Sequence, residues 1–188
     1  VKRKTKETTV NVEIDLHGNG RCNISTDIPF INHMLELFAF HGNFDLKIKA
    51  TGDTVIDNHH LVEDIGITLG QAIKEALGNR KGITRYGSFL MPMDEALSYI
   101  VIDISSRPFL SFKVKFKKVF SIEFDYGLIE DFFKALVSNA GMTLHIRILN
   151  GKNNHHIAES IFKGFGKALA MAVTKAGSKK ILSTKGKL

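Results

Sequence analysis

The chain has too few cysteines for the disulfide bonds that stabilise small secreted domains. It has a single cysteine, Cys22, and no tryptophan. One thiol cannot form an internal disulfide or an all-cysteine metal site, so a disulfide scaffold and a four-cysteine centre are excluded. We expect Cys22 to be an ordinary small residue of a strand.

Long apolar runs are also absent. No stretch approaches the roughly 18 consecutive apolar residues that span a bilayer, and the opening residues Val1–Lys4 lead into a polar segment instead of the apolar core of a signal peptide. We therefore expect a cytoplasmic protein that does not act at a membrane.

Composition otherwise suits a folded protein and leaves the kind of partner open. The 188 residues are 44% hydrophobic, which is enough for a core in one domain or in two fused halves. The net charge of +7 fits nucleic acid, a membrane surface or a phosphorylated small molecule. Because the basic residues are scattered and the densest run lies in the tail, Lys175–Lys187, we do not expect nucleic-acid binding.

Hydrophobic periodicity predicts strands and helices in the first half. Alternation in Thr8–Leu16 and the Gly-Asn-Gly turn at 18–20 predict a hairpin with a second strand at Cys22–Ser25. The other predicted elements are a helix over Ile31–Ala39 that stops at Gly42, a strand over Phe44–Ala50, and a helix over Asn58–Leu77 with Asp57 or Asn58 as its cap and Gly78 at its end.

The second half repeats this order. Its predicted elements are strands over Ala96–Ile104 and Phe109–Phe116, a helix over Leu128–Asn139, a strand over Met142–Leu149 and a helix over Asn154–Ala176. At a constant offset, His59-His60-x-x-Glu63, Gly70, Ala72 and Ala76 recur as His155-His156-x-x-Glu159, Gly166, Ala168 and Ala172. We predict an α+β fold of two duplicated β-β-α-β-α halves, residues 1–90 and 91–188, which form one compact catalytic unit with helices on one face of each sheet.

The paired histidines carry the functional signal. Four of the eight histidines form two adjacent pairs at the starts of matching helices. Neighbouring helical residues point about 100° apart, whereas a histidine and a glutamate four residues on share a face. We therefore predict two metal ions. The assignment places His59 with Glu63 at one ion and His155 with Glu159 at the other, and His60 and His156 each reach the opposite ion.

Further ligands are needed, and His33 and His145 are the best remaining donors. Such a nitrogen-rich set suits manganese, iron, zinc or nickel, and six-coordinate geometry favours manganese or iron. Taken alone, a strand histidine such as His145 is more often a hydrogen-bonded core residue, and one HHxxE segment is often a polar helix face. The duplication argues against both. We expect His17, beside the Gly-Asn-Gly turn, to be a surface residue.

Several strings resemble one enzyme family, in order and across nearly the full length. They are Arg3–Thr8 (RKTKET), Phe30–Leu35 (FINHML), Asp57–Asp64 (DNHHLVED), Pro92–Leu97 (PMDEAL), Arg107–Phe109 (RPF) and Asn153–Glu159 (NNHHIAE). Together they resemble imidazoleglycerol-phosphate dehydratase.

The resemblance implies an activity, a cofactor and an assembly. The activity is dehydration of imidazole glycerol phosphate to imidazole acetol phosphate in histidine biosynthesis, through an imidazolate held by two manganese ions. The fold it implies has two halves similar to the second domain of ribosomal protein S5, assembled into a homo-oligomer of 24 subunits with active sites at subunit contacts. The metal ligands it implies are His33, His59, His60, Glu63, His145, His155, His156 and Glu159, the set also reached from spacing.

Other roles rest on the resemblance. Glu7 falls at the position of a proton-transferring carboxylate, although on its own it would be a surface glutamate near a terminus; Glu63 and Glu159 are the other carboxylates expected at the catalytic centre. The phosphate-binding positions are Arg85, Arg107, Lys163, Ser183 and Lys185. His41 and Asp94 are expected near the substrate or the ligands.

Two departures from the family pattern stand out. Leu37 replaces a glutamine of many relatives, which puts one polar substrate contact in doubt, and Ser106 replaces the usual glycine. Without the resemblance, a dinuclear metallohydrolase acting on a phosphorylated or amide substrate would lead, since paired metals most often activate water. An RNA-binding module would leave six histidines unexplained.

Overall fold

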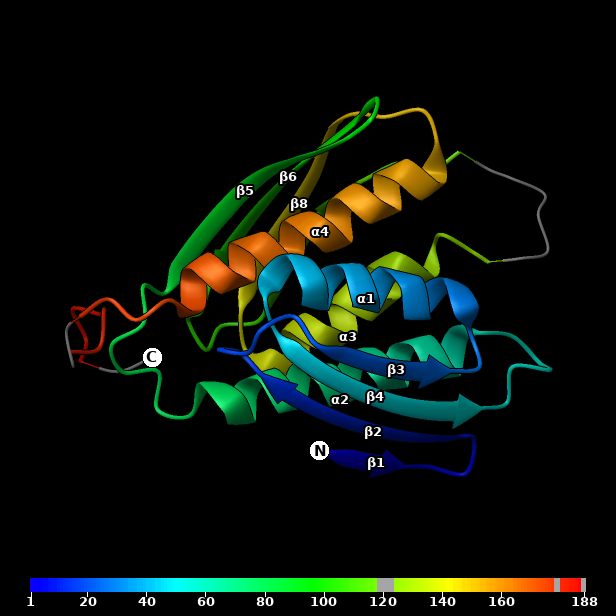
Figure 1. Ribbon diagram of the computed structural model, residues 1–188, viewed down its shortest axis with the longest axis horizontal. Coiled ribbons are helices and arrows are strands. Elements are labelled where there is room, and N and C mark those ends of the chain that lie inside the picture. The colour runs from blue at the N-terminus through cyan, green and yellow to red at the C-terminus, as the bar shows by residue number, and fades with distance from the viewer. Residues whose placement is uncertain (118–123, 178–179, 187–188) are drawn as a thin grey trace.

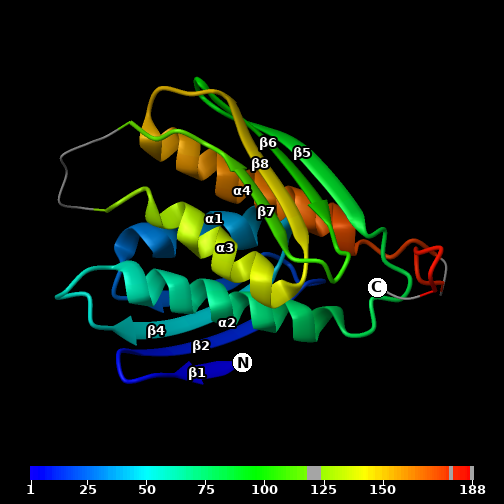
Figure 2. The same ribbon diagram turned by 180° about the vertical axis from the view of Figure 1, so that it is seen from behind.

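Among the residues described by a computed structural model of the chain, two four-stranded sheets enclose four helices (Figures 1 and 2). The structure describes residues 1–117, 124–177 and 180–186, so Lys187, the end of the basic run, lies outside the described residues. No helix within these ranges has the length and apolar character needed to cross a bilayer.

Both sheets have the same strand order. The first is β1-β2-β4-β3 and the second is β5-β6-β8-β7, and in each the last pair is parallel while the other pairs are antiparallel. This repeat confirms the predicted duplication, and β1 and β5 are strands that the periodicity does not predict. The strands are β1 Lys2–Lys4, β2 Thr8–Asp15, β3 Cys22–Thr26, β4 Asp45–Gly52, β5 Tyr86–Met93, β6 Ala96–Asp103, β7 Phe109–Lys113 and β8 Thr143–Asn150.

The predicted hairpin between β2 and β3 is wrong. Strand β4 lies between them, antiparallel to β2 and parallel to β3. The Gly-Asn-Gly segment instead crosses the start of β4, where the backbone N–H groups of Asn19 and Arg21 donate to Asp45 Oδ1 at 2.7 and 3.0 Å. Gly18 passes so close that a Cβ there would collide with the backbone of Asp45. Gly18 therefore permits a close crossing, while Gly20 adopts a positive φ of 81°.

The helices form the two inner layers. They are α1 Pro29–Gly42, α2 His59–Leu77, α3 Leu128–Ala140 and α4 Asn154–Val173. Helix α2 packs on the first sheet and on α3, and α4 packs on the second sheet and on α1, so each inner contact joins the two halves. Helices on one face of each sheet confirm the predicted arrangement. Figure 1 shows all four helices starting at the right-hand end of the molecule.

Helix ends follow local sequence. Helix α1 ends before Asn43, which adopts a left-handed backbone with φ 56°, and α2 ends at Gly78 as predicted. Helix α4 ends at Val173, before the predicted Ala176. The chain leaves the helix at Thr174, where ψ is 136°, and Lys175 forms a β-bridge with Ile83.

Two equivalent glycines set the spacing between the inner helices. A Cβ at Gly70 would collide with the carbonyl oxygen of Leu136 on α3, and one at Gly166 would collide with that of Phe38 on α1. The helix backbones therefore touch at both places. Around these contacts the fully buried phenylalanines, such as Phe133 and Phe165, form one continuous core with residues of both sheets.

The variant Gly166→Ala tests this close packing. Alanine stabilises an ordinary helix by about 1 kcal/mol relative to glycine, but overpacking here should reverse the sign and cost about 1–3 kcal/mol. The midpoint of denaturant unfolding, measured at fixed protein concentration, should fall. Lys167→Ala, the next residue along the helix, should leave it nearly unchanged. A Gly166→Ala protein as stable as the wild type would contradict the close helix contact.

Candidate metal centre and anion-binding cavity

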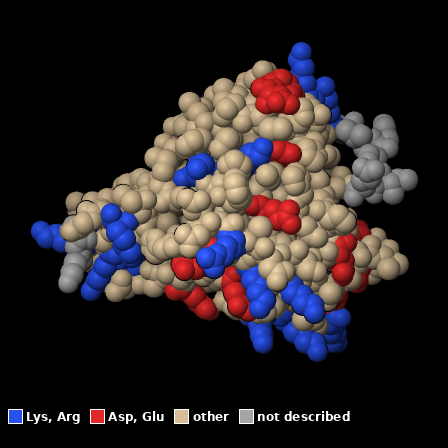
Figure 3. All heavy atoms as spheres, viewed as in Figure 1, with Lys and Arg blue, Asp and Glu red and all other residues tan. Residues whose placement is uncertain are grey.

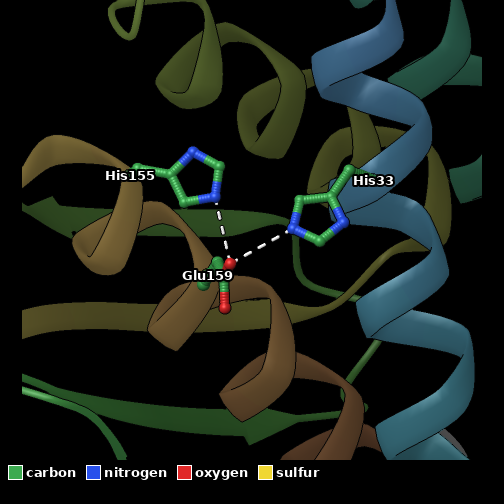
Figure 4. Close-up of side chains that lie close together, drawn as sticks. All are labelled: His33, His155 and Glu159. Atoms are coloured by element: carbon green, nitrogen blue, oxygen red, sulfur yellow. Dashed lines mark hydrogen bonds and ion pairs between the residues drawn. The ribbon is translucent and has the colours of Figure 1, made fainter.

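Three predicted ligands from two helices meet at one point. His33 of α1 and His155 of α4 both direct Nε2 at Glu159 Oε1, at 3.1 and 3.0 Å (Figure 4). Their rings stack with centroids 5.5 Å apart. The His155–Glu159 contact spans one helical turn, as the sequence spacing predicts, whereas His33 comes from the other half of the chain.

The donor atoms suit a divalent ion. One atom of each of the three residues lies within 4.8 Å of the others. Two ligands at right angles on an ion with bonds of about 2.1 Å would be about 3 Å apart, close to the observed contacts. Two imidazoles and a carboxylate match manganese, iron or zinc. The residues present therefore fit a metal ion.

Glu159 is held ionised. Burial raises the pKa of this carboxylate, but hydrogen bonds from Lys163, His33 and His155 outweigh it and lower the pKa to about 2. The Lys163 ammonium donates to Glu159 Oε2 at 2.6 Å. Lys163 thus lies on the ligand-bearing face of α4, as its spacing from Glu159 predicts. It also helps to lower the pKa of half-buried His41, after the larger effect of burial.

A second cluster surrounds the first HHxxE segment. His60 Nδ1 donates to Asp53 Oδ2 at 3.1 Å and lies 3.7 Å from Glu7 Oε2. The hydrogen bond to Asp53, followed by the charge of Glu7, raises the pKa of His60. One atom from each of these three residues falls within 4.8 Å of the others. The sequence singled out Glu7 and His60 but not Asp53.

His156 has a carboxylate partner of its own. Its Nδ1 donates to Glu95 Oε2 at 2.7 Å, which raises the pKa of His156. That bond and those from the backbone N–H groups of Asn153 and Lys152 lower the pKa of Glu95 to about 2. Asp94, the neighbour that the sequence did single out, is exposed and lies 3.8 Å from His156 Nε2. The PMDEAL string contained both acids, so the signal for Glu95 was present.

The remaining predicted ligands are not gathered within one chain. His59 and Glu63 share the exposed face of α2, and His145 is exposed on β8 between buried Leu144 and Ile146. Within the described ranges no hydrogen bond or ion pair links His59 to Glu63. The two HHxxE segments therefore contribute to two separate clusters of side chains.

A buried carboxylate ties the first strands to α2. Asp64 accepts from Arg3 Nε at 2.7 Å and from the hydroxyl of Thr8. Thr5 Oγ1 in turn accepts from the backbone N–H of Glu7 at 3.1 Å. This network fixes the turn between β1 and β2 that carries Glu7. Asp64 belongs to the DNHHLVED string, but sequence reasoning gave it no role.

Four of the five predicted phosphate-binding residues line one cavity of about 650 Å³. They are Arg85, Arg107, Ser183 and Lys185. The fifth, Lys163, lies with Glu159 instead. Figure 1 shows the start of β5 and the C-terminal segment at the left-hand end, away from the helix starts, and Figure 3 shows basic side chains gathered there. Cationic and hydroxyl donors in one cavity suit a phosphate group.

Arg85 organises this cavity. Its guanidinium donates to both oxygens of Asp103, at 2.7 and 3.1 Å, and to the carbonyl oxygen of Leu182 at 2.7 Å. Its backbone N–H donates to the carbonyl oxygen of Ala172 near the end of α4. One buried side chain therefore holds the C-terminal segment against the second sheet.

The two departures from the family pattern have different surroundings. Ser106 adopts a left-handed backbone with φ 58°, a conformation that favours glycine, and its hydroxyl accepts from the buried Arg80. Leu37 is partly buried and packs against the hydrophobic core.

Comparison with known proteins defines first a class and then a family. The structure matches crystal structures of imidazoleglycerol-phosphate dehydratase (IGPD) from Pyrococcus furiosus (41% identity, TM-score 0.87, all of both chains) and Staphylococcus aureus (40%, 0.82, 93% of this chain and 98% of that one). The fold is thus that of a duplicated α+β hydro-lyase.

Sequence relatives give the family. The family model described as imidazoleglycerol-phosphate dehydratase matches residues 26–169. Relatives of that name from Endomicrobium trichonymphae and Rhodopseudomonas palustris strain TIE-1 are 58% and 53% identical, over 99% and 100% of this chain and 95% and 96% of theirs. The chain belongs to the imidazoleglycerol-phosphate dehydratase family.

The variant Arg85→Lys tests the anchoring of the C-terminal segment. Lysine cannot reproduce the paired contact with Asp103 while also reaching Leu182, so the segment should detach more often. Limited trypsin digestion should remove it several-fold faster than in the wild type. Arg147→Lys on the open side of β8 is the matched control and should digest like the wild type. Equal digestion of all three proteins would contradict the anchoring role.

Proposed function

We propose that the chain converts imidazole glycerol phosphate to imidazole acetol phosphate, as a cytoplasmic enzyme of histidine biosynthesis with two Mn²⁺ ions per active site. The convergence of His33, His155 and Glu159 in a member of this family carries the proposal. The proposed ligand set is completed by His59, His60, Glu63, His145 and His156.

The chemistry explains the need for strong electrophiles. Dehydration removes a carbon-bound proton and the hydroxyl on the neighbouring carbon, and the resulting enol becomes the ketone. No carbonyl group acidifies that proton, so the imidazole ring must take up the charge. When bound, two divalent ions supply Lewis acidity at the ring nitrogens.

Residues of this chain supply the other functions. Glu7 is the proposed proton carrier, on a turn fixed through Asp64. The proposed phosphate site uses Arg85, Arg107, Ser183 and Lys185 from the cavity, with Lys163 beside the ligands. His41 and Asp94 are the proposed neighbours of substrate and ligands.

The geometry of one chain supports assembly. The two ligand clusters are separate and the cavity lies at the opposite end from the helix starts, so a complete site draws on more than one copy. The outer face of the second sheet also supports it, because His145 lies there beside exposed Tyr99 and Phe109. The outer face of the first sheet carries Lys47 and Lys49 instead. We propose a homo-oligomer of 24 subunits with sites at the contacts.

Metal content and turnover test the function together. Elemental mass spectrometry of purified protein should find close to two manganese ions per chain. Activity on imidazole glycerol phosphate should disappear on chelation and return with manganese, and the product should be a ketone that retains its phosphate. His145→Ala should lower metal affinity by more than about tenfold, and His17→Ala, an exposed histidine outside the clusters, should not.

Other outcomes would separate the parts of the proposal. Two metals with release of free phosphate would support a hydrolase and overturn the dehydratase. Undiminished activity in a metal-free sample would overturn the metal-dependent mechanism.

Chelation should also lower the oligomeric state. If ligands of one ion come from different copies, metal binding is linked to association, so removing the ions weakens the assembly. Light scattering coupled to size exclusion should show a smaller mass after chelation and the original mass after manganese is returned. A chelated sample that keeps its full mass would contradict sites shared between subunits.

A further inference from the structure

The second histidine of each HHxxE segment makes the same contact. His60 Nδ1 donates to Asp53 Oδ2 at 3.1 Å, and His156 Nδ1 donates to Glu95 Oε2 at 2.7 Å. In both rings Nδ1 is therefore occupied by a carboxylate. The first histidine, as seen in His155, presents Nε2 to its glutamate.

The carboxylates that accept these two hydrogen bonds stand at different places in the two halves. Asp53 follows β4, whereas Glu95 lies in the turn between β5 and β6. The counterpart of Glu95 in the first half is Glu7, which stands directly before β2 as Glu95 stands directly before β6, and its Oε2 lies 3.7 Å from His60 Nδ1. A carboxylate thus faces Nδ1 of the second histidine in both halves, through Glu95 in the second half and chiefly through Asp53 in the first, which points to a requirement at the ring.

Glu95 is fixed independently of the ring. Its Oε1 accepts from the backbone N–H groups of Lys152 and Asn153, at 3.0 and 2.7 Å. Asn153 also caps α4, where its side chain accepts from the N–H of His155 at 2.8 Å. One carboxylate therefore joins the β5–β6 turn, the start of α4 and the His156 ring. Among the described residues Glu95 belongs to neither group of converging donor atoms, which fits an orienting role.

We propose that Glu95 and Asp53 are positioning residues that fix the tautomer and orientation of His156 and His60, with Nδ1 protonated and Nε2 directed at the metal. A carboxylate that accepts from one ring nitrogen leaves the lone pair on the other, which is how such partners tune histidine ligands. The proposal rests on the proposed function, since it takes both histidines as metal ligands.

Asp53 differs in its second oxygen. Its Oδ1 is buried and has no hydrogen-bond partner among the residues that the structure describes. Glu7 also approaches His60 Nδ1, at 3.7 Å. The main experiment therefore uses His156 and Glu95, because a second carboxylate also lies near His60. Asp53→Asn is the equivalent variant in the other cluster.

The decisive variant is Glu95→Gln. An amide has one acceptor oxygen, and three N–H donors face this side chain. If that oxygen serves Lys152 and Asn153, the amide nitrogen faces His156 Nδ1 and favours a proton on Nε2, which then cannot bind a metal. Titration calorimetry with Mn²⁺ should show affinity about 10–100-fold lower than in the wild type. The Co²⁺-loaded protein should show an altered visible absorption band.

Two controls separate positioning from folding. Glu13→Gln, an exposed glutamate on the first sheet, should bind Mn²⁺ like the wild type. The melting temperature of the metal-free Glu95→Gln protein should stay near that of the metal-free wild type, while the rise caused by Mn²⁺ should shrink. In a His156→Ala background, Glu95→Gln should cause little further loss of affinity, because both changes remove one interaction.

Opposite results would overturn the proposal. A Glu95→Gln protein that melts earlier but binds Mn²⁺ with wild-type affinity would make Glu95 a loop anchor only. An equal loss of affinity with and without His156 would show that Glu95 acts through another group. In both cases the wild-type metal sites, and with them the proposed function, would stand. A wild-type protein that binds no divalent metal would overturn both.

Discussion

Close contact between helix backbones of opposite halves is the constraint on which the structure depends. Gly70 and Gly166 allow α2 to touch α3 and α4 to touch α1. Neither half can cover the apolar side of its own helices, so the sheets form outer layers around a shared core. His33 reaches His155 and Glu159 because of this exchange, since α1 is placed against α4 by the glycine contact.

The same arrangement places the histidines and the cavity around Arg85 at different ends of one chain. Helix starts with their histidines lie at one end, and the cavity around Arg85 lies at the other. The residues proposed for metal binding and most of those proposed for phosphate binding are thus separated within a single chain. The proposed function therefore depends on the proposed assembly, in which the face around His145 would become part of the site.

Much of the fold and part of the candidate site could be predicted from the sequence, because they depend on local spacing. Periodicity and the repeated HHxxE segments indicated the duplicated halves and the His155–Glu159 contact, because both depend on local spacing. The insertion of β4 between β2 and β3 could not be predicted, since strand pairing depends on contacts distant in sequence. Asp53 and Glu95 were missed for a similar reason: each partners a histidine through the fold, and a contact of that kind is not encoded in local spacing, even though Glu95 lies within the PMDEAL string.

The exchange of helix contacts between the halves has a consequence for how the chain can be divided. Its pattern is that of a two-fold dimer in which the same faces meet, with a covalent link added. A chain cut between the sheets would yield two fragments with complementary apolar helical faces. Neither would be stable alone, and together they would rebuild the four layers. One ancestral half, paired with a second copy of itself, would have met the same packing requirement.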